Sequence, residues 1–401
     1  MPLRLDSARS VVQNNGMMAG EKKTELLPAA RELDLEDWRA AMAEIGLSSF
    51  RASQVWHGLQ ASLVRSWDEL TTLPAALRSE LAGRFDVDTL TEREVTETPD
   101  GVRKWLSACR DGERIESVLI PSEDRWTLCI SSQIGCAYGC AFCASGKTGL
   151  SRNLTAGEIV DQAVLATRWL RNAQAAGTIG PVERDPDRRH DRPLRPHNIV
   201  VMGMGEPLAN YDAVLRALRI LNAPNGLGIG ARHITISTCG LVPGIRRLSE
   251  EGTQFELSVS LHAPNDALRS RLLPVNERWP LRELIAACQD YTARTGRIVT
   301  FEYTLVRGLN DQPEQARELA ALLSQWNCRV NLIPLSPVAE FDGEAPDEAT
   351  CLAFQNILKQ SRIHTTLRRS RGRSVDAACG QLRLRRLFDP KPDENRAPMT
   401  Q

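Results

Sequence analysis

Apolar residues in the N-terminal part of the chain recur at three- and four-residue spacing, which is the pattern of an amphipathic helix. This spacing is followed by Leu35, Trp38, Met42 and Ile45 and by the stretches 50–63 and 68–81. The pattern predicts a small helical accessory domain over residues 31–90. Residues 1–30 contain few large apolar side chains, so we expect them to form a disordered leader.

A linker and a hairpin are predicted over residues 91–126. The segment Thr98-Pro99-Asp100-Gly101 combines a proline with an Asp-Gly pair, and both are strong turn signals. Residues 103–120 follow this turn, and we expect them to form a hairpin that leads into the main domain.

From about residue 127 onward, short β-branched runs alternate with helical stretches. Strands are predicted at 128–132, 198–202, 233–237, 256–261, 299–305 and 329–333, and helices at 156–171, 211–221, 244–250, 281–295 and 313–326. This alternation predicts an α/β fold with a parallel sheet and right-handed crossovers. Six such units form an open partial (βα)6 barrel over residues 127–386, with its working end at the carboxyl edges of the strands.

Two segments fall outside this alternation. Residues 172–196 are rich in Pro and Arg and predict a surface insertion in the barrel. Residues 387–401 are polar, and we expect a disordered tail there.

The composition is that of an ordinary globular protein, with 42% hydrophobic and 25% charged residues in a chain of 401. No run of about 18 apolar residues occurs, so no membrane-spanning helix is expected. The polar N-terminus lacks the apolar stretch of a signal peptide, which predicts a cytoplasmic protein. In that reducing compartment, a tight group among the ten cysteines indicates metal binding or redox chemistry.

The charge of the chain is balanced overall, with 50 basic and 50 acidic residues, but it is not evenly distributed. Residues 359–386 contain nine Lys or Arg side chains and one acid, Asp376. Such an excess suits the phosphate backbone of a nucleic acid. A solvated basic face is the alternative interpretation of the same pattern.

Three cysteines lie close together in Cys136-Ala-Tyr-Gly-Cys140-Ala-Phe-Cys143, directly after the first predicted barrel strand. Three thiolates can hold three irons of a [4Fe–4S] cluster and leave the fourth iron open. An open iron can chelate S-adenosylmethionine and pass an electron to its sulfonium, which generates a radical.

Structural zinc is the rival interpretation, and it requires four closed ligands. The loop offers no fourth Cys or His, and the nearest candidate, Cys129, lies seven residues upstream within a predicted strand. The spacing therefore favours an iron–sulfur cluster.

With Phe142 before the last cysteine, this array resembles that of the radical S-adenosylmethionine superfamily. Four segments narrow the resemblance to the RNA adenine-C2 methyltransferases: Cys129-Ile-Ser-Ser-Gln-Ile-Gly-Cys136, Met202-Gly-Met-Gly-Glu206-Pro-Leu, Val259-Ser-Leu-His262-Ala-Pro-Asn-Asp266 and Asp376-Ala-Ala-Cys379-Gly-Gln-Leu382. The resemblance covers about residues 31–386 without the insertion. It implies methylation of adenosine 2503 in 23S rRNA and of adenosine 37 in tRNAs. It also implies a monomer with an electron donor such as flavodoxin or ferredoxin.

The same resemblance implies a binding pocket for S-adenosylmethionine, formed by Gly205, Glu206, Ser237, Ser260, Leu261, His262 and Asn331. Most of these lie near the carboxyl end of a predicted strand, as a barrel site requires. Two positions depart from the family pattern: Cys239 replaces a frequent serine, and Ser336 replaces a common asparagine.

Three further residues receive catalytic roles from the resemblance. Cys379 takes a methyl group and carries its carbon to adenine C2, and Cys129 releases the product by closing a transient disulfide with Cys379. Glu116 matches a proton acceptor, although the sequence leaves open whether Glu116 or Cys129 takes the C2 proton. The accessory domain, with Lys147 and Arg152 beside the cysteine loop, is expected to help bind RNA.

Two other functions are compatible with these motifs. One is methylation of adenine C8 in ribosomal RNA by a relative that uses the same cysteines. The other is an iron–sulfur or zinc RNA-binding module without catalysis, for which Cys379 and Cys129 would be dispensable.

Overall fold

We describe the chain from a computed structural model. The structure describes residues 26–122, 125–179, 194–324, 326–336 and 341–368. The predictions of a disordered tail, of most of the leader and the insertion, and of the roles of Cys379 therefore concern residues outside the described ranges. The leader prediction is wrong for Ala29 and Ala30, which are buried.

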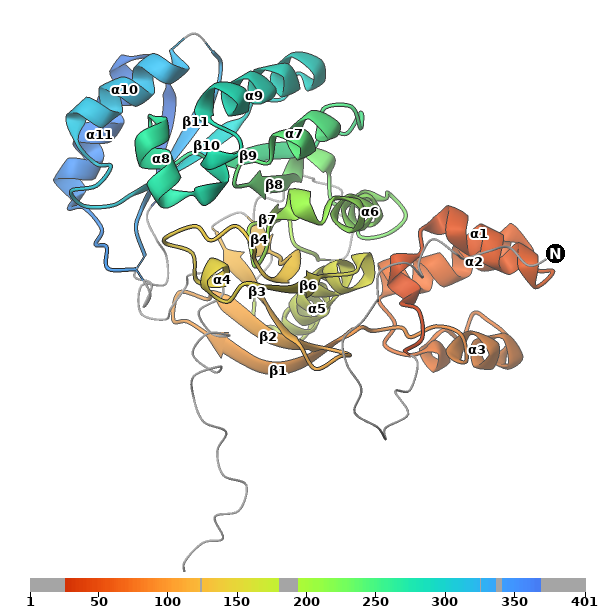
Figure 1. The fold of residues 1–401 in the computed structure, drawn as a ribbon. Coiled ribbons are helices and arrows are strands. Elements are labelled where there is room, and N and C mark those ends of the chain that lie inside the picture. Colours follow the sequence, from red (N-terminus) through yellow and green to blue (C-terminus); the bar gives the residue numbers. More distant parts are fainter. Residues whose placement is uncertain (1–25, 123–124, 180–193, 325, 337–340, 369–401) are drawn as a thin grey trace, which may run out of the picture.

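In the described part of the chain, a sheet of ten strands organises the fold, in the order β1-β2-β3-β4-β7-β8-β9-β10-β11-β12. Seven neighbouring strands run parallel (Figure 1): β4 (Trp126–Cys129), β7 (Asn198–Val201), β8 (Ile234–Thr238), β9 (Glu256–Ser260), β10 (Thr300–Leu305), β11 (Arg329–Pro334) and β12 (His364–Leu367). The six predicted strands and the partial-barrel fold are confirmed. The sequence prediction missed β12, because this four-residue strand has only one aliphatic side chain.

Helices cover the outer face of the parallel strands (Figure 1). They are α5 (Ala156–Ala175), α6 (Tyr211–Asn222), α7 (Val242–Leu248), α8 (Asp266–Leu272), α9 (Leu281–Thr295), α10 (Pro313–Leu323) and α11 (Glu348–Gln360). Helix α5 begins with a capping box, in which the Thr155 hydroxyl accepts from the Glu158 N–H and the Glu158 carboxylate from the Thr155 N–H. Because α5 continues to Ala175, residues 172–175 belong to this helix and not to an insertion.

Three antiparallel strands extend the sheet on one side: β1 (Leu90–Glu97), β2 (Arg103–Cys109) and β3 (Arg114–Pro121). The predicted hairpin is confirmed as β2 and β3. The prediction of a linker is wrong for residues 91–97, because β1 pairs with β2 from Leu90 to Glu97. The turn predicted at Gly101 is present, with a φ of 79°.

The helical prediction for the N-terminal part is confirmed by α1 (Leu35–Glu44), α2 (Ser49–His57) and α3 (Ala75–Ala82). Their core is aromatic: the Trp38 ring is fully buried and contacts Trp67 and Phe85 edge-on, at centroid distances of 6.1 and 5.1 Å.

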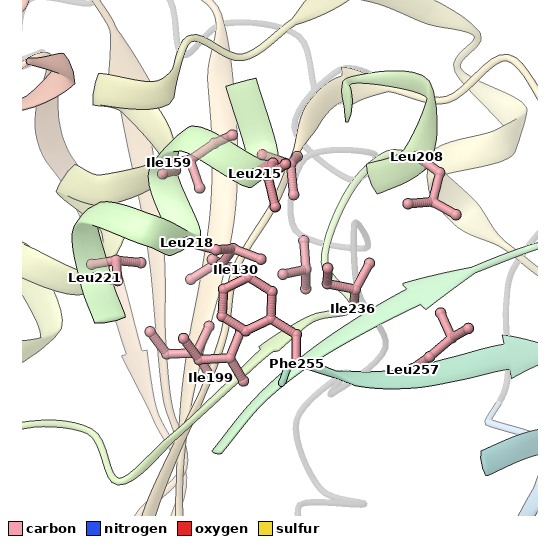
Figure 2. Packing of buried hydrophobic residues seen from close by; sticks show 14 of the residues in the cluster. Ile130, Ile159, Ile199, Leu208, Leu215, Leu218, Leu221, Ile236, Phe255 and Leu257 are labelled. Atoms are coloured by element: carbon pink, nitrogen blue, oxygen red, sulfur yellow. The ribbon is translucent and has the colours of Figure 1, made fainter. Parts of the chain in front are cut away.

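The main core lies between the parallel strands and their helices. Figure 2 shows Ile130, Ile199 and Ile236 from the sheet side in contact range of Ile159 and Leu218 from helices α5 and α6. All five side chains are at most 1% exposed. This packing fixes the strands, so the residues at their carboxyl ends keep defined positions.

Buried ion pairs connect the accessory helices to α5 of the barrel. The Arg31 guanidinium is fully buried and lies 3.0 Å from the Asp161 carboxylate and 3.1 Å from that of Asp88. Arg168 of α5 pairs with the same Asp88 at 2.7 Å and donates to the Val64 carbonyl oxygen. Charges at such depth are stable only when they remain paired.

Replacing Asp161 with asparagine is therefore expected to lower the free energy of unfolding by about 3 kcal/mol. The change leaves the Arg31 charge buried with one carboxylate fewer, while an amide oxygen can still accept from the Thr89 N–H and hydroxyl. Urea unfolding measures the difference. Arg39→Ala removes an exposed ion pair with Glu36 and is the control, with an expected change within about 0.5 kcal/mol. Equal stabilities of the two variants would contradict the account.

Candidate active site

The three clustered cysteines lie on a loop between two short strands, β5 (Gln133–Gly135) and β6 (Leu150–Asn153). Backbone hydrogen bonds hold this loop at two points, from the Cys136 N–H to Gly149 O and from the Ala141 N–H to Leu272 O, each 2.9 Å long. The loop therefore presents its thiols from a fixed backbone next to the carboxyl end of helix α8.

The three thiols share one electrostatic environment. The pKa of the Cys136 thiol is raised to about 11, mainly by burial and to a smaller extent by Cys143 and Glu206, while a hydrogen bond from the Tyr138 backbone opposes the rise. Burial also raises the pKa of Cys140 well above its usual value, with Cys143 and Cys136 as the next causes. The Cys136 and Cys140 thiols are thus protonated without a metal, and metal binding must release their protons.

The donor set fits an iron–sulfur cluster better than a single metal ion. Among the described residues, no three His, Cys, Asp or Glu side chains are placed to hold one ion together. A cubane does not need such convergence, because each cysteine binds a different iron. The zinc alternative needs four ligands around one point, and Cys129 does not supply a fourth, since it packs with Val102 and Val118.

Residues of the parallel strands alternate between the helix-covered face and the inner face of the curved sheet. Ile236, Val259 and Val330 belong to the main core, so their neighbours along each strand face inward. These inward positions include three predicted pocket residues: Ser237 on β8, Ser260 on β9 and Asn331 on β11. The structure brings these three residues to one face of the sheet.

The segment Met202–Glu206 runs alongside the chain that leads into the cysteine loop. The N–H groups of Ser132 and Gln133 both donate to Met204 O, at 2.8 and 3.1 Å. Gly205 has a φ of 99°, and a Cβ there would lie 2.5 Å from the Gln133 side chain. Only glycine permits this approach.

Glu206 is a buried carboxylate at the carboxyl end of β7. Its oxygens accept from the N–H of Leu208 at 2.9 Å and from the N–H of Cys239 at 2.7 Å. Burial raises its pKa, and these hydrogen bonds oppose the rise. Glu206 therefore joins the ends of two strands next to the cysteine thiols.

His262 is held in one orientation beside the cysteine loop. Its φ is 57°, its Nδ1 accepts from the Thr304 N–H at 2.8 Å, and its carbonyl oxygen accepts from the Asn310 amide at 2.8 Å. The ring packs edge-on against Phe142 at a centroid distance of 4.8 Å. Since Nδ1 accepts, the neutral ring carries its proton on Nε2. The neighbouring Leu261 is fully buried in the main core, so only its backbone can contact a ligand.

Burial lowers the pKa of His262 to about 3, and the Arg269 charge adds to this effect. The unfolded chain therefore binds an extra proton between pH 3 and the usual value of 6.5. Stability contributed by the neutral ring is lost as the pH falls through this window, by up to about 1.4 kcal/mol per pH unit.

We expect His262→Asn to remove this dependence, because asparagine tolerates the left-handed backbone and does not titrate there. Urea unfolding of metal-free protein from pH 7 to pH 5 measures the slope. His57→Asn changes an exposed histidine and should keep the wild-type slope. Parallel slopes for His262→Asn and wild type would show that the ring does not remain neutral in the folded protein.

Two buried charged residues of the site were missed from the sequence. Glu302 of β10 accepts from the Asn331 amide at 2.7 Å, while the Thr366 hydroxyl donates to the other end of that amide at 3.0 Å. Arg269 of α8 is fully buried and donates to the carbonyl oxygens of Cys239 and Ser260. A charged residue between two aromatics, Phe301-Glu302-Tyr303, was the available signal for Glu302; Arg269 gave none, because its helix was not predicted.

The catalytic residues taken from the resemblance are placed in part. Glu116 and Val118 lie on the same face of β3, and Val118 is the register partner of Cys129 on β4. Val118 and Cys129 form a small cluster with Val200 and Met202, separate from the helix-covered core. Glu116 and Cys129 therefore both face the inside of the sheet.

Within the described ranges, no helix is both long and apolar enough to cross a membrane.

Known proteins resemble this chain in both sequence and structure. Residues 187–320 match the Radical SAM superfamily. A probable dual-specificity RNA methyltransferase RlmN from Symbiobacterium thermophilum is 45% identical over 357 residues, covering 88% of this chain and 90% of that protein. The corresponding enzyme from Syntrophobacter fumaroxidans is 45% identical, covering 87% of this chain and 95% of its own.

A solved structure agrees with these relatives. The crystal structure of a radical SAM methyltransferase from Sphaerobacter thermophilus superposes with a TM-score of 0.81 at 46% identity. The match covers 88% of this chain and 98% of that one, so nearly the whole solved fold is present here.

Proposed function

Because the chain belongs to the RlmN family of dual-specificity RNA methyltransferases, within the radical SAM superfamily, we propose that it methylates C2 of an adenosine in 23S rRNA and in tRNA. In this proposal the target positions are adenosine 2503 of the rRNA and adenosine 37 of tRNAs. The observation that carries the proposal is the position of the three thiols of Cys136, Cys140 and Cys143, on a fixed loop beside Glu206 and His262.

In this proposal the three thiols hold a [4Fe–4S] cluster, and Gly205, Glu206, Ser237, Ser260, Leu261, His262 and Asn331 bind S-adenosylmethionine. The bound cofactors supply a methyl group and a radical that removes a hydrogen atom. The chain's own residues direct this chemistry to the base. The Cys379 sulfur accepts the methyl group, and its carbon then bonds to adenine C2.

Glu116 and Cys129 complete the reaction in this proposal. One of them takes the C2 proton, and both face the inside of the sheet, where a base would enter. Cys129 then attacks the Cys379 sulfur, which closes a disulfide and releases the methylated adenosine.

Cys129→Ala is therefore expected to trap RNA covalently on the protein at Cys379. The thiol needed for release is absent, while the steps that join the carbon to the base remain. Denaturing gel electrophoresis with labelled RNA measures the adduct, and Cys109→Ala, another buried thiol on a strand, is the control. Free methylated RNA from Cys129→Ala at the wild-type rate would contradict this role.

The partners follow from the same proposal. RNA phosphates would contact the basic run that begins at Lys359, of which the structure describes residues up to Arg368. A low-potential flavodoxin or ferredoxin would reduce the cluster of a monomeric, cytoplasmic enzyme. Peptide mass spectrometry of cluster-loaded protein tests the function: a methyl group on Cys379 supports it, and its persistent absence counts against it.

A further inference from the structure

Arg269 is a buried cation that no step of the proposed reaction uses. It lies on helix α8, its side chain is fully buried, and within the described part of the chain no carboxylate lies within ion-pair distance of its guanidinium. An isolated charge in the interior is strongly destabilising unless polar groups or an opposite charge compensate it.

Three neutral oxygens supply only part of this compensation. The guanidinium donates to Asn276 Oδ1 at 2.8 Å, to Cys239 O at 2.8 Å and to Ser260 O at 3.0 Å. Its Nε has no hydrogen-bond partner within the described ranges. The Asp266 carboxylate, which interacts electrostatically with the guanidinium, is engaged with the Asn276 amide and the Leu281 N–H.

The cysteine loop contacts the helix that carries this cation. The Ala141 N–H, between Cys140 and Cys143, donates to Leu272 O in the last turn of the helix that carries Arg269. Among the ionisable groups in electrostatic range of the guanidinium are the thiols of Cys140 and Cys239. The backbone is shaped to admit the side chain, because a Cβ at Gly240 would lie 2.9 Å from Arg269 Nη2.

We infer that Arg269 is the counter-charge of the iron–sulfur cluster and makes its reduction more favourable. The inference rests on the proposed function, which places the cluster on Cys136, Cys140 and Cys143. A [4Fe–4S] cluster with three thiolate ligands is anionic, and one electron from a low-potential donor adds a further negative charge. A fixed cation beside it stabilises the reduced form more than the oxidised form. Arg269 is thus a positioning residue that acts through the cluster.

Substitutions that separate charge from shape test this role. In Arg269→Gln the side chain keeps hydrogen-bond donors but loses its charge, whereas Arg269→Lys keeps the charge and loses the planar fork. Arg168→Gln removes a largely buried arginine at the accessory-domain junction and is the control. Each full-length, cluster-loaded protein is poised at a series of potentials, and the reduced fraction is measured by electron paramagnetic resonance and normalised to bound iron.

At a fixed potential, Arg269→Gln is expected to lower the ratio of reduced to oxidised cluster at least tenfold, which corresponds to 59 mV for one electron. Arg269→Lys and Arg168→Gln should remain within about threefold of wild type. If Arg269→Gln holds no cluster while Arg269→Lys holds one with the wild-type ratio, the charge is required for the site and the inference stands.

Two outcomes would overturn the inference. One is an unchanged ratio of reduced to oxidised cluster in cluster-loaded Arg269→Gln. The other is loss of the cluster from both Arg269 variants, which would show that Arg269 only maintains the geometry of the cysteine loop. Failure of the proposed function looks different. In that case the wild-type chain itself would hold no reducible cluster or would not methylate RNA.

Discussion

Replacing Cys140 with alanine is expected to remove the iron–sulfur cluster and to lower RNA methylation by at least about a thousandfold. Replacing a residue that only supports a metal ligand typically lowers metal affinity or activity 10- to 100-fold. Replacing a ligand itself should lower them by more than this. Cys140 is the middle cysteine of the loop, and its thiol interacts electrostatically with both of the others. Without it, two ligands remain for a cluster that already has one open iron.

Iron content, the visible absorption of the cluster and methyl transfer to RNA measure this effect together. Cys351→Ala is the matched control, because Cys351 is another buried thiol but lies on helix α11. The control should keep its iron and its activity. Full iron content in Cys140→Ala would show that the loop is not the cluster site.

Replacing Cys379 with alanine should lower methylation on the order of 10⁴-fold or more, as expected for loss of a nucleophile that works as a unit with its partners. The cluster and the S-adenosylmethionine pocket do not include this residue. Iron content and reductive cleavage of S-adenosylmethionine should therefore persist. This combination separates a catalytic role from misfolding.

The Cys379 prediction is checked by parallel assays of methylated RNA and of cleaved S-adenosylmethionine. Methylation at the wild-type rate by Cys379→Ala would remove the methyl carrier from the mechanism. It would leave an RNA-binding or differently acting radical protein as the interpretation.

Periodicity was sufficient to predict the parallel strands, because each has a short β-branched core that only burial explains. It failed where tertiary pairing decides the structure. Strand β12 is stabilised by its neighbour β11, with Val330 opposite Thr365, and its own four residues carry little signal. Strand β1 contains six charged or hydroxyl side chains, in Thr91-Glu92-Arg93-Glu94 and Thr96-Glu97, yet it pairs along its length with β2.

The candidate site, like the fold, could be predicted from the sequence only in part. The cysteine spacing and the motifs identified the candidate residues, and the alternation of the strands brings Ser237, Ser260 and Asn331 to one face. The sequence could not predict the roles of the buried charged residues Arg269 and Glu302, because these roles depend on which groups the fold places next to them. Their partners lie on other strands or beyond a turn, as the hydrogen bonds of Arg269 to Cys239 O and Ser260 O show.

The most direct test of the central claim is nucleoside mass spectrometry of 23S rRNA and tRNA from cells that lack the gene. We expect 2-methyladenosine to disappear from both RNAs, to return with the wild-type chain and to stay absent with the Cys379→Ala chain. Retained 2-methyladenosine in the deletion strain, or loss of 8-methyladenosine in its place, would contradict the assignment.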